Sequence, residues 1–375
     1  MRSFIRAGIV LLIGAAGGAC NKDSAAPVDF ENPAAVSSNL SAVDGTFDTD
    51  VYRSFSSATF RLDAATAPAI RPAATLLGAV RPKLERTGAL VFLPQLLQAR
   101  KLQALTPNLS VAAAQGTIIP DSMYGRVFEW DTTGVGQYTY QGNTVANLNG
   151  VRFLLYAVGL DGEVFEPVTQ IGTLDIIDLS TPSVARLQVL VKNTAGTTTF
   201  VDYTIEFTST QTSAQATATG SISNGQTGDG GRELNFNQTL TVNANGARVV
   251  ATFTLTNPAL TLMLNESVAF EDPNVVINAD FRVIVNNSTI RTVGRITINQ
   301  TTLDIAVNIS VYVDGHPVAS ISGDPTLPQT QWVDAGGEPL TLADLAALDD
   351  LFDALENFDT AVGGLFAPIA TFAGL

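Results

Sequence analysis

Apolar and polar residues alternate with a period of two through the middle of the chain, from about residue 124 to residue 323. In the run from Leu303 to Val313, apolar side chains at odd positions alternate with Asp304, Asn308 and Ser310. Such alternation places one row of side chains in a dry core and the other in water. The pattern therefore predicts β-strands with one dry face and one wet face.

Turn signals separate these strands at short intervals, for example Asn224-Gly225, Asn245-Gly246 and Asp314-Gly315. Asn-Gly and Asp-Gly pairs supply the positive φ angles that tight hairpin turns require. Strands joined by short turns are antiparallel neighbours, so we expect a meander of roughly nine to twelve strands.

Helical patterns flank the predicted sheet on both sides. Residues 46–110 favour two or three short helices, and residues 340–358 favour one longer helix. Thr341 and Asp344 resemble a capping box at the start of the longer helix. Four residues then form an apolar stripe at helical spacing: Leu345, Leu348, Phe352 and Leu355.

These elements predict an α+β fold that is mostly β. We expect a large curved antiparallel β-meander over residues 124–323, with N-terminal and C-terminal helices packed on its dry face. A two-sheet β-sandwich is the alternative. We expect residues 46–375 to form a single domain, preceded by a flexible, proline-bearing tether at residues 21–45.

The first twenty residues have the layout of an export signal. Arg2 and Arg6 precede an apolar run of about ten residues, which is too short to span a bilayer. Small residues then lead to Cys20, the only cysteine of the chain. The sequence therefore predicts a signal peptide at residues 1–20, with cleavage close to Cys20.

The segment Gly17-Gly18-Ala19-Cys20 resembles the lipobox of bacterial lipoproteins, although Gly17 stands where that family usually carries Leu. The resemblance implies that Cys20 receives acyl chains such as palmitate and becomes the new N-terminus. Asn21 follows in place of the Asp that favours inner-membrane retention in the family. The resemblance thus implies an exported protein that is anchored to the cell envelope at the outer membrane.

The formal net charge of the chain is −15, and removal of the signal peptide takes away two positive charges and no negative ones. An acidic surface repels phosphate backbones and keeps a protein soluble. We therefore expect no nucleic-acid partner. The expected partners are the membrane, through the lipid anchor, and a lipid or an envelope protein.

The sequence offers little catalytic chemistry. His316 is the only histidine, and its place in Asp314-Gly315-His316-Pro317 is typical of a hairpin turn. Nucleophilic catalysis and zinc binding both need further groups around a histidine. We therefore expect no enzymatic activity and no cofactor.

Two further clusters invite a functional interpretation. Asp44, Asp48 and Asp50 could supply carboxylates to calcium, but their spacing does not match an EF-hand, and solvated acidic residues are the simpler interpretation. Aromatic residues near the start of the sheet could stack on a sugar or simply pack on one another; they are Trp130, Tyr138 and Tyr140.

Three functional hypotheses follow. The first is a noncatalytic cell-envelope lipoprotein with a structural or binding role. The second is a carrier of lipid or another apolar ligand, in a cavity between the sheet and the helices. The third is an envelope glycan hydrolase, which would need two carboxylates facing each other across a cleft about 5–10 Å wide.

Overall fold

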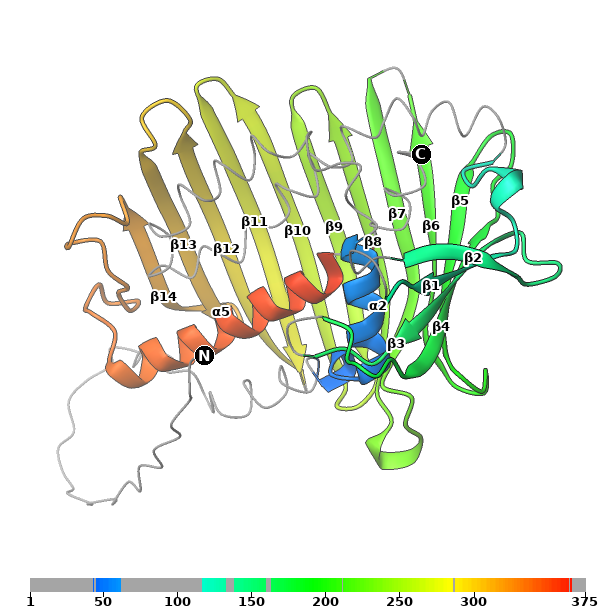
Figure 1. Ribbon diagram of the computed structural model, residues 1–375. Helices are drawn as coiled ribbons and strands as arrows, with labels where there is room; N and C mark the ends of the chain where they lie inside the picture. The colour runs from blue at the N-terminus through cyan, green and yellow to red at the C-terminus, as the bar shows by residue number, and fades with distance from the viewer. Residues whose placement is uncertain are drawn as a thin grey trace.

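The computed structural model describes residues 43, 45–61, 117–132, 138–159, 163–210, 212–285, 287–363 and 365. The signal peptide with Cys20, most of the tether and most of the predicted helical segment 46–110 lie outside these residues. What the structure describes is dominated by one large sheet, shown as a ribbon in Figure 1.

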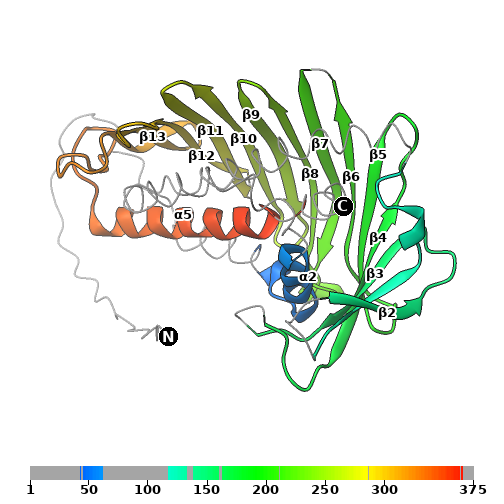
Figure 2. The same ribbon diagram turned by 45° about the horizontal axis from the view of Figure 1, so that its top comes forward.

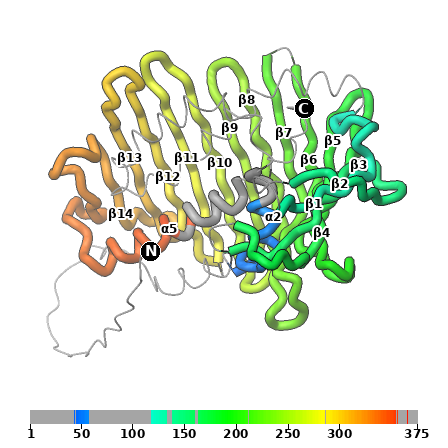
Figure 3. Tube along the Cα trace, in the orientation of Figure 1, coloured from blue at the N-terminus to red at the C-terminus, as the bar shows by residue number. Residues whose placement is uncertain are grey.

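The described strands number fourteen and form a single sheet. Their order along the sheet is β14-β13-β12-β11-β10-β9-β8-β7-β6-β5-β4-β3-β1-β2. Figure 3 follows the chain through the successive hairpins. The strand bounds are β1 Arg126–Trp130, β2 Tyr138–Thr144, β3 Gly150–Tyr156, β4 Gln170–Asp178, β5 Ala185–Asn193, β6 Thr199–Ser209, β7 Ser213–Ser223, β8 Glu233–Asn243, β9 Gly246–Leu255, β10 Leu260–Glu271, β11 Asn274–Val285, β12 Ser288–Asn299, β13 Ile305–Val313 and β14 His316–Gly323.

The mostly β fold and the large open sheet confirm the sequence prediction at this level. The expected strand count of nine to twelve is too low, and the described strands do not divide into two sheets, as a sandwich would require. The sheet is also not wholly antiparallel, because β1 runs parallel to β3. Strand β2 forms the edge beyond β1, and its polar sequence YTYQGNT suits an edge exposed to water.

The two faces of the sheet differ as the alternation predicts. One face, here called the inner face, carries a continuous apolar cluster that includes Val189, Ile205, Phe253 and Ile309. The opposite, outer face carries the intervening polar side chains. The sheet curves, and helices α2 (Asp50–Arg61) and α5 (Leu342–Gly363) lie on its inner side in Figures 1 and 2.

Helix α5 begins where the sequence indicates. The Thr341 hydroxyl donates to an Asp344 carboxylate oxygen at 2.6 Å, and the Asp344 backbone N–H donates back to that hydroxyl at 3.3 Å. The helix extends beyond the predicted range of 340–358 and ends at Gly363, the first residue of the Gly363-Gly364 pair. No helix breaker occurs before Gly363, so backbone hydrogen bonding can continue to that residue.

Helix α2 falls inside the predicted helical segment and contacts β3, β4, β5 and β6. The remainder of that segment, from residue 62 to residue 110, lies outside the described residues. Among the helices that the structure describes, none combines the length and the apolar character needed to cross a membrane.

An arginine groove on the outer face of the sheet

A groove of about 700 Å³ lies on the outer face, across strands β9 to β13. Its lining is mostly polar and includes three arginines, Arg248, Arg291 and Arg295. Asp280 is the only acidic residue among the described residues that line it. We call this surface the arginine groove.

One row of side chains crosses the groove perpendicular to the strands. The antiparallel register places Arg248 of β9 beside Ser267 of β10, and Ser267 beside Asn278 of β11. Asn278 in turn pairs with Arg295 of β12, and Arg295 with Asn308 of β13. The hydroxyl of Ser267 and the amide of Asn278 thus lie between the guanidinium-bearing residues Arg248 and Arg295.

Asp280 connects two further arginines next to this row. Its carboxylate accepts two hydrogen bonds from Arg291, at 2.9 and 2.8 Å, and two from Arg282, at 3.2 and 2.9 Å. Hydrogen bonds from Arg291 are the main reason that the pKa of Asp280 falls to about 2, with a further contribution from Arg282. Asp280 therefore stays ionised at neutral pH and fixes both guanidinium groups.

The other two arginines have unused hydrogen-bonding capacity. Arg248 donates from Nε to the Asn265 side-chain oxygen at 3.1 Å, and its terminal nitrogens donate to no group in the described part of the chain. The exposed Arg295 side chain makes neither a hydrogen bond nor an ion pair with any of those residues. Three guanidinium groups and one carboxylate thus line the groove, in a chain that is acidic as a whole.

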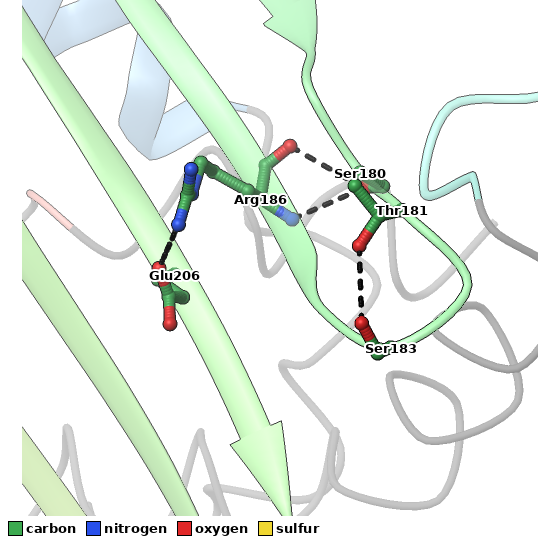
Figure 4. Close-up of polar contacts among 5 residues, drawn as sticks. All are labelled: Ser180, Thr181, Ser183, Arg186 and Glu206. Carbon is green, nitrogen blue, oxygen red and sulfur yellow. Dashed lines mark hydrogen bonds and ion pairs between the residues drawn. The ribbon is translucent and has the colours of Figure 1, made fainter.

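An arginine elsewhere on the outer face is arranged differently. Arg186 of β5 forms an ion pair with Glu206 of β6, as Figure 4 shows. Its backbone N–H donates a hydrogen bond to the Ser180 hydroxyl at 3.0 Å, across the turn between β4 and β5. Arg186 therefore has a carboxylate of its own, whereas Arg248 and Arg295 have none within the described residues.

A second groove, of about 440 Å³, lies on the outer face across β6 to β9. Its described lining includes Asp202, Asn235 and Asn237 but no basic residue. The concentration of guanidinium groups therefore distinguishes the arginine groove from its polar neighbour.

The candidate calcium ligands are only partly described. Asp48 accepts a hydrogen bond from Arg53 at 3.2 Å, and Asp50 forms an ion pair with the same guanidinium. Asp44 lies outside the described residues. Across the described ranges, no three His, Cys, Asp or Glu side chains are gathered as a metal ion would need.

The remaining sequence candidates lie away from the groove. His316 is exposed at the first position of β14, directly after the hairpin turn. The aromatic residues contact one another: Trp130 and Tyr138 meet edge to face at 5.5 Å, and Tyr138 meets Phe153 in the same way at 5.4 Å. Cys20 lies outside the described residues.

The arginine groove is not evident from the sequence alone. Its residues come from five strands, and their proximity depends on the strand register. A partial signal exists in β12, where Arg291 and Arg295 are four residues apart in an alternating segment and therefore share a face. Arg282 and Asp280 share a face for the same reason.

No protein-family model, no curated protein and no solved structure matches the chain.

Proposed function

We propose that this chain is a noncatalytic binding protein of the cell envelope, held to a membrane by a lipid on Cys20. The arginine groove is the observation that supports a binding role most directly. It combines a volume within the range of small-ligand sites, about 300–1,000 Å³, with polar side chains whose hydrogen-bonding capacity is unused.

The chemistry of the groove suits binding better than catalysis. Arginine keeps its proton at all physiological pH values and cannot act as a general base. Asp280 is ionised and held by two guanidinium groups, so it is poorly placed to donate a proton. Glycan hydrolysis would need a second, opposed carboxylate, and the described lining contains only Asp280.

In this proposal the helices cover the inner face and leave the outer face for the ligand. Buried apolar residues of α5 belong to the same cluster as the inner-face strands, among them Leu348, Leu351 and Phe352. Phe352 stacks on Trp332 with ring centroids 5.9 Å apart. The Tyr203 hydroxyl of β6 donates to the Leu365 carbonyl at 3.0 Å, just beyond α5.

The anchor is tested by intact-mass analysis and membrane fractionation of the full-length protein from its own envelope. We expect a mass increase by acyl chains on Cys20 and recovery in the membrane fraction. The Cys20→Ser variant should lose both. An unmodified Cys20, or a Cys20→Ser variant that remains in the membrane fraction, would contradict the proposed anchor.

A second candidate function is the carriage of an apolar ligand on the inner face. The supporting observation is Gln238 of β8, which is 1% exposed among the buried apolar residues of this face. Its side-chain oxygen accepts no hydrogen bond within the described residues, and burial of an unsatisfied polar atom is costly. A ligand with a polar head could satisfy it.

Native mass spectrometry distinguishes this candidate. A carrier would retain a lipid that is released on unfolding, and the Gln238→Leu variant would retain less of it. The carrier hypothesis is wrong if no apolar molecule copurifies with the protein. The role of Gln238 in it is wrong if the Gln238→Leu variant retains as much lipid as the unaltered protein.

A further inference from the structure

We infer that the arginine groove binds an acidic oligosaccharide, that is, a short glycan bearing carboxylate groups. The inference rests on the proposed binding role of the groove and adds the chemical class of the ligand. It depends on the two arginines without a carboxylate partner and on the amide and hydroxyl side chains beside them.

The spacing of the arginines favours a ligand with more than one carboxylate. Arg248 and Arg295 stand on β9 and β12, three strand steps apart. At about 4.8 Å a step, their backbones are separated by roughly 14 Å. A single small anion would not readily bridge them, whereas a chain of acidic sugars can present one carboxylate to each guanidinium. Guanidinium groups pair with carboxylates through two parallel hydrogen bonds.

The side chains near the two arginines match the hydroxyl groups of a sugar. Asn278 and Asn308 flank Arg295 in the same row, and neither side chain makes a hydrogen bond within the part of the chain that the structure describes. An amide side chain both donates and accepts hydrogen bonds, as a sugar hydroxyl does. Tyr312, also in the lining, offers an aromatic surface to a sugar ring.

Other anionic partners fit this surface less well. Single-stranded nucleic acid is usually held by several stacked aromatic residues, and Tyr312 is the only aromatic residue in the described lining. The net charge of −15 also opposes a long polyanion, whereas a short oligosaccharide would meet mainly the local positive charge. An anionic lipid surface would contact protruding groups, but Ser267 and Asn278 are half-buried between the arginines.

Isothermal titration calorimetry at low salt tests the inference, with tetragalacturonate as the acidic probe and maltotetraose as the neutral one. We expect the full-length protein to bind tetragalacturonate and to bind maltotetraose at least about tenfold more weakly. Arg248→Gln and Arg295→Gln should each weaken tetragalacturonate binding by at least about tenfold, since each removes a charged hydrogen-bond donor from the ligand. Arg186→Gln removes the same charge from an ion pair outside the groove and should leave the affinity unchanged.

Several results would overturn the inference. One is absence of tetragalacturonate binding, or equal affinity for tetragalacturonate and maltotetraose. Another is a loss of affinity in Arg186→Gln as large as that in the two groove variants. A third is tighter binding of a single-stranded DNA oligonucleotide or of phosphatidylglycerol vesicles than of tetragalacturonate. The proposed function is judged separately. If native mass spectrometry shows another class of ligand that is lost from the groove variants, the acidic-glycan inference fails and the binding role stands.

Discussion

Asp280, in the lining of the arginine groove, fixes two of the neighbouring arginines. Its carboxylate holds Arg282 on its own strand and Arg291 on the next, each through two hydrogen bonds. Because both guanidinium groups are fixed in this way, their positions do not depend on a bound ligand. We therefore assign Asp280 a positioning role.

Replacement of Asp280 by Asn should lower the free energy of unfolding by about 1 kcal/mol at neutral pH, a value typical of a partly exposed ion pair. The pKa of the carboxyl is lowered in the folded state, from 3.8 to about 2. Its stabilisation is therefore complete above the ordinary pKa and is lost as the pH falls through about 2. Urea unfolding of the unaltered protein and of Asp280→Asn, between about pH 7 and pH 2, measures this effect. The difference between their free energies of unfolding should shrink as the pH falls from about 4 to about 2. A difference independent of pH would contradict the account.

Asp178, at the end of β4, connects the sheet to the segment before β1. One of its carboxylate oxygens accepts backbone hydrogen bonds from Ile118 and Ile119, at 2.6 and 2.7 Å. The other accepts from the Ser180 backbone N–H at 2.9 Å. The carboxylate is buried, so its loss would leave backbone donors without an acceptor.

The Asp178→Ala variant should lose about 2–3 kcal/mol of stability, because a buried donor without a partner costs about 1–3 kcal/mol. Asp202→Ala, which removes an exposed carboxylate from β6, is the matched control and should change stability by less than about 0.5 kcal/mol. Chemical denaturation measures both. Equal effects of the two substitutions would show that the backbone contacts of Asp178 contribute little.

At the scale of elements, local patterns predicted the helix start and most of the sheet. The alternation in β13, for example, appears directly as buried and exposed positions. The capping pair Thr341 and Asp344 sets the start of α5. The insertion of β1 between β2 and β3 could not be predicted in this way, because a parallel pairing follows from long-range contacts and not from any local turn.

The candidate site was predictable only in fragments for the same reason. The spacing of Arg291 and Arg295 places them on one face of a strand, but the approach of Arg248 requires the register of three successive hairpins. A period-two pattern gives the face of each residue and not its neighbours on other strands. The groove therefore became visible only once the register was known.

Helix α5 provides a prediction at this scale. Phe352→Ala should destabilise the protein by about 3–5 kcal/mol, since the ring is 6% exposed and stacks on Trp332. Asp350→Ala, on an exposed position of the same helix, should have little effect and serves as the control. Thermal or urea unfolding compares them. If Phe352→Ala unfolds like Asp350→Ala, α5 does not contribute to the core as proposed.

In the molecule as a whole, three parts of the chain have separate roles. We propose that the N-terminal segment supplies a membrane anchor and the outer face a binding groove, while the inner face supplies the hydrophobic core. The net charge of −15 opposes anionic ligands in general, so the local cluster of guanidinium groups must provide the attraction. Binding at the groove should therefore weaken as salt screens that attraction.

Native mass spectrometry of the protein purified from its own envelope, with and without the paired substitutions Arg248→Gln and Arg295→Gln, shows whether the arginine groove holds a ligand. We predict a bound ligand on the unaltered protein and on the Arg186→Gln control, and its loss from the doubly substituted protein. Retention of the same ligand by the doubly substituted protein, or the absence of any ligand from the unaltered protein, would contradict the assignment of the arginine groove as the binding site.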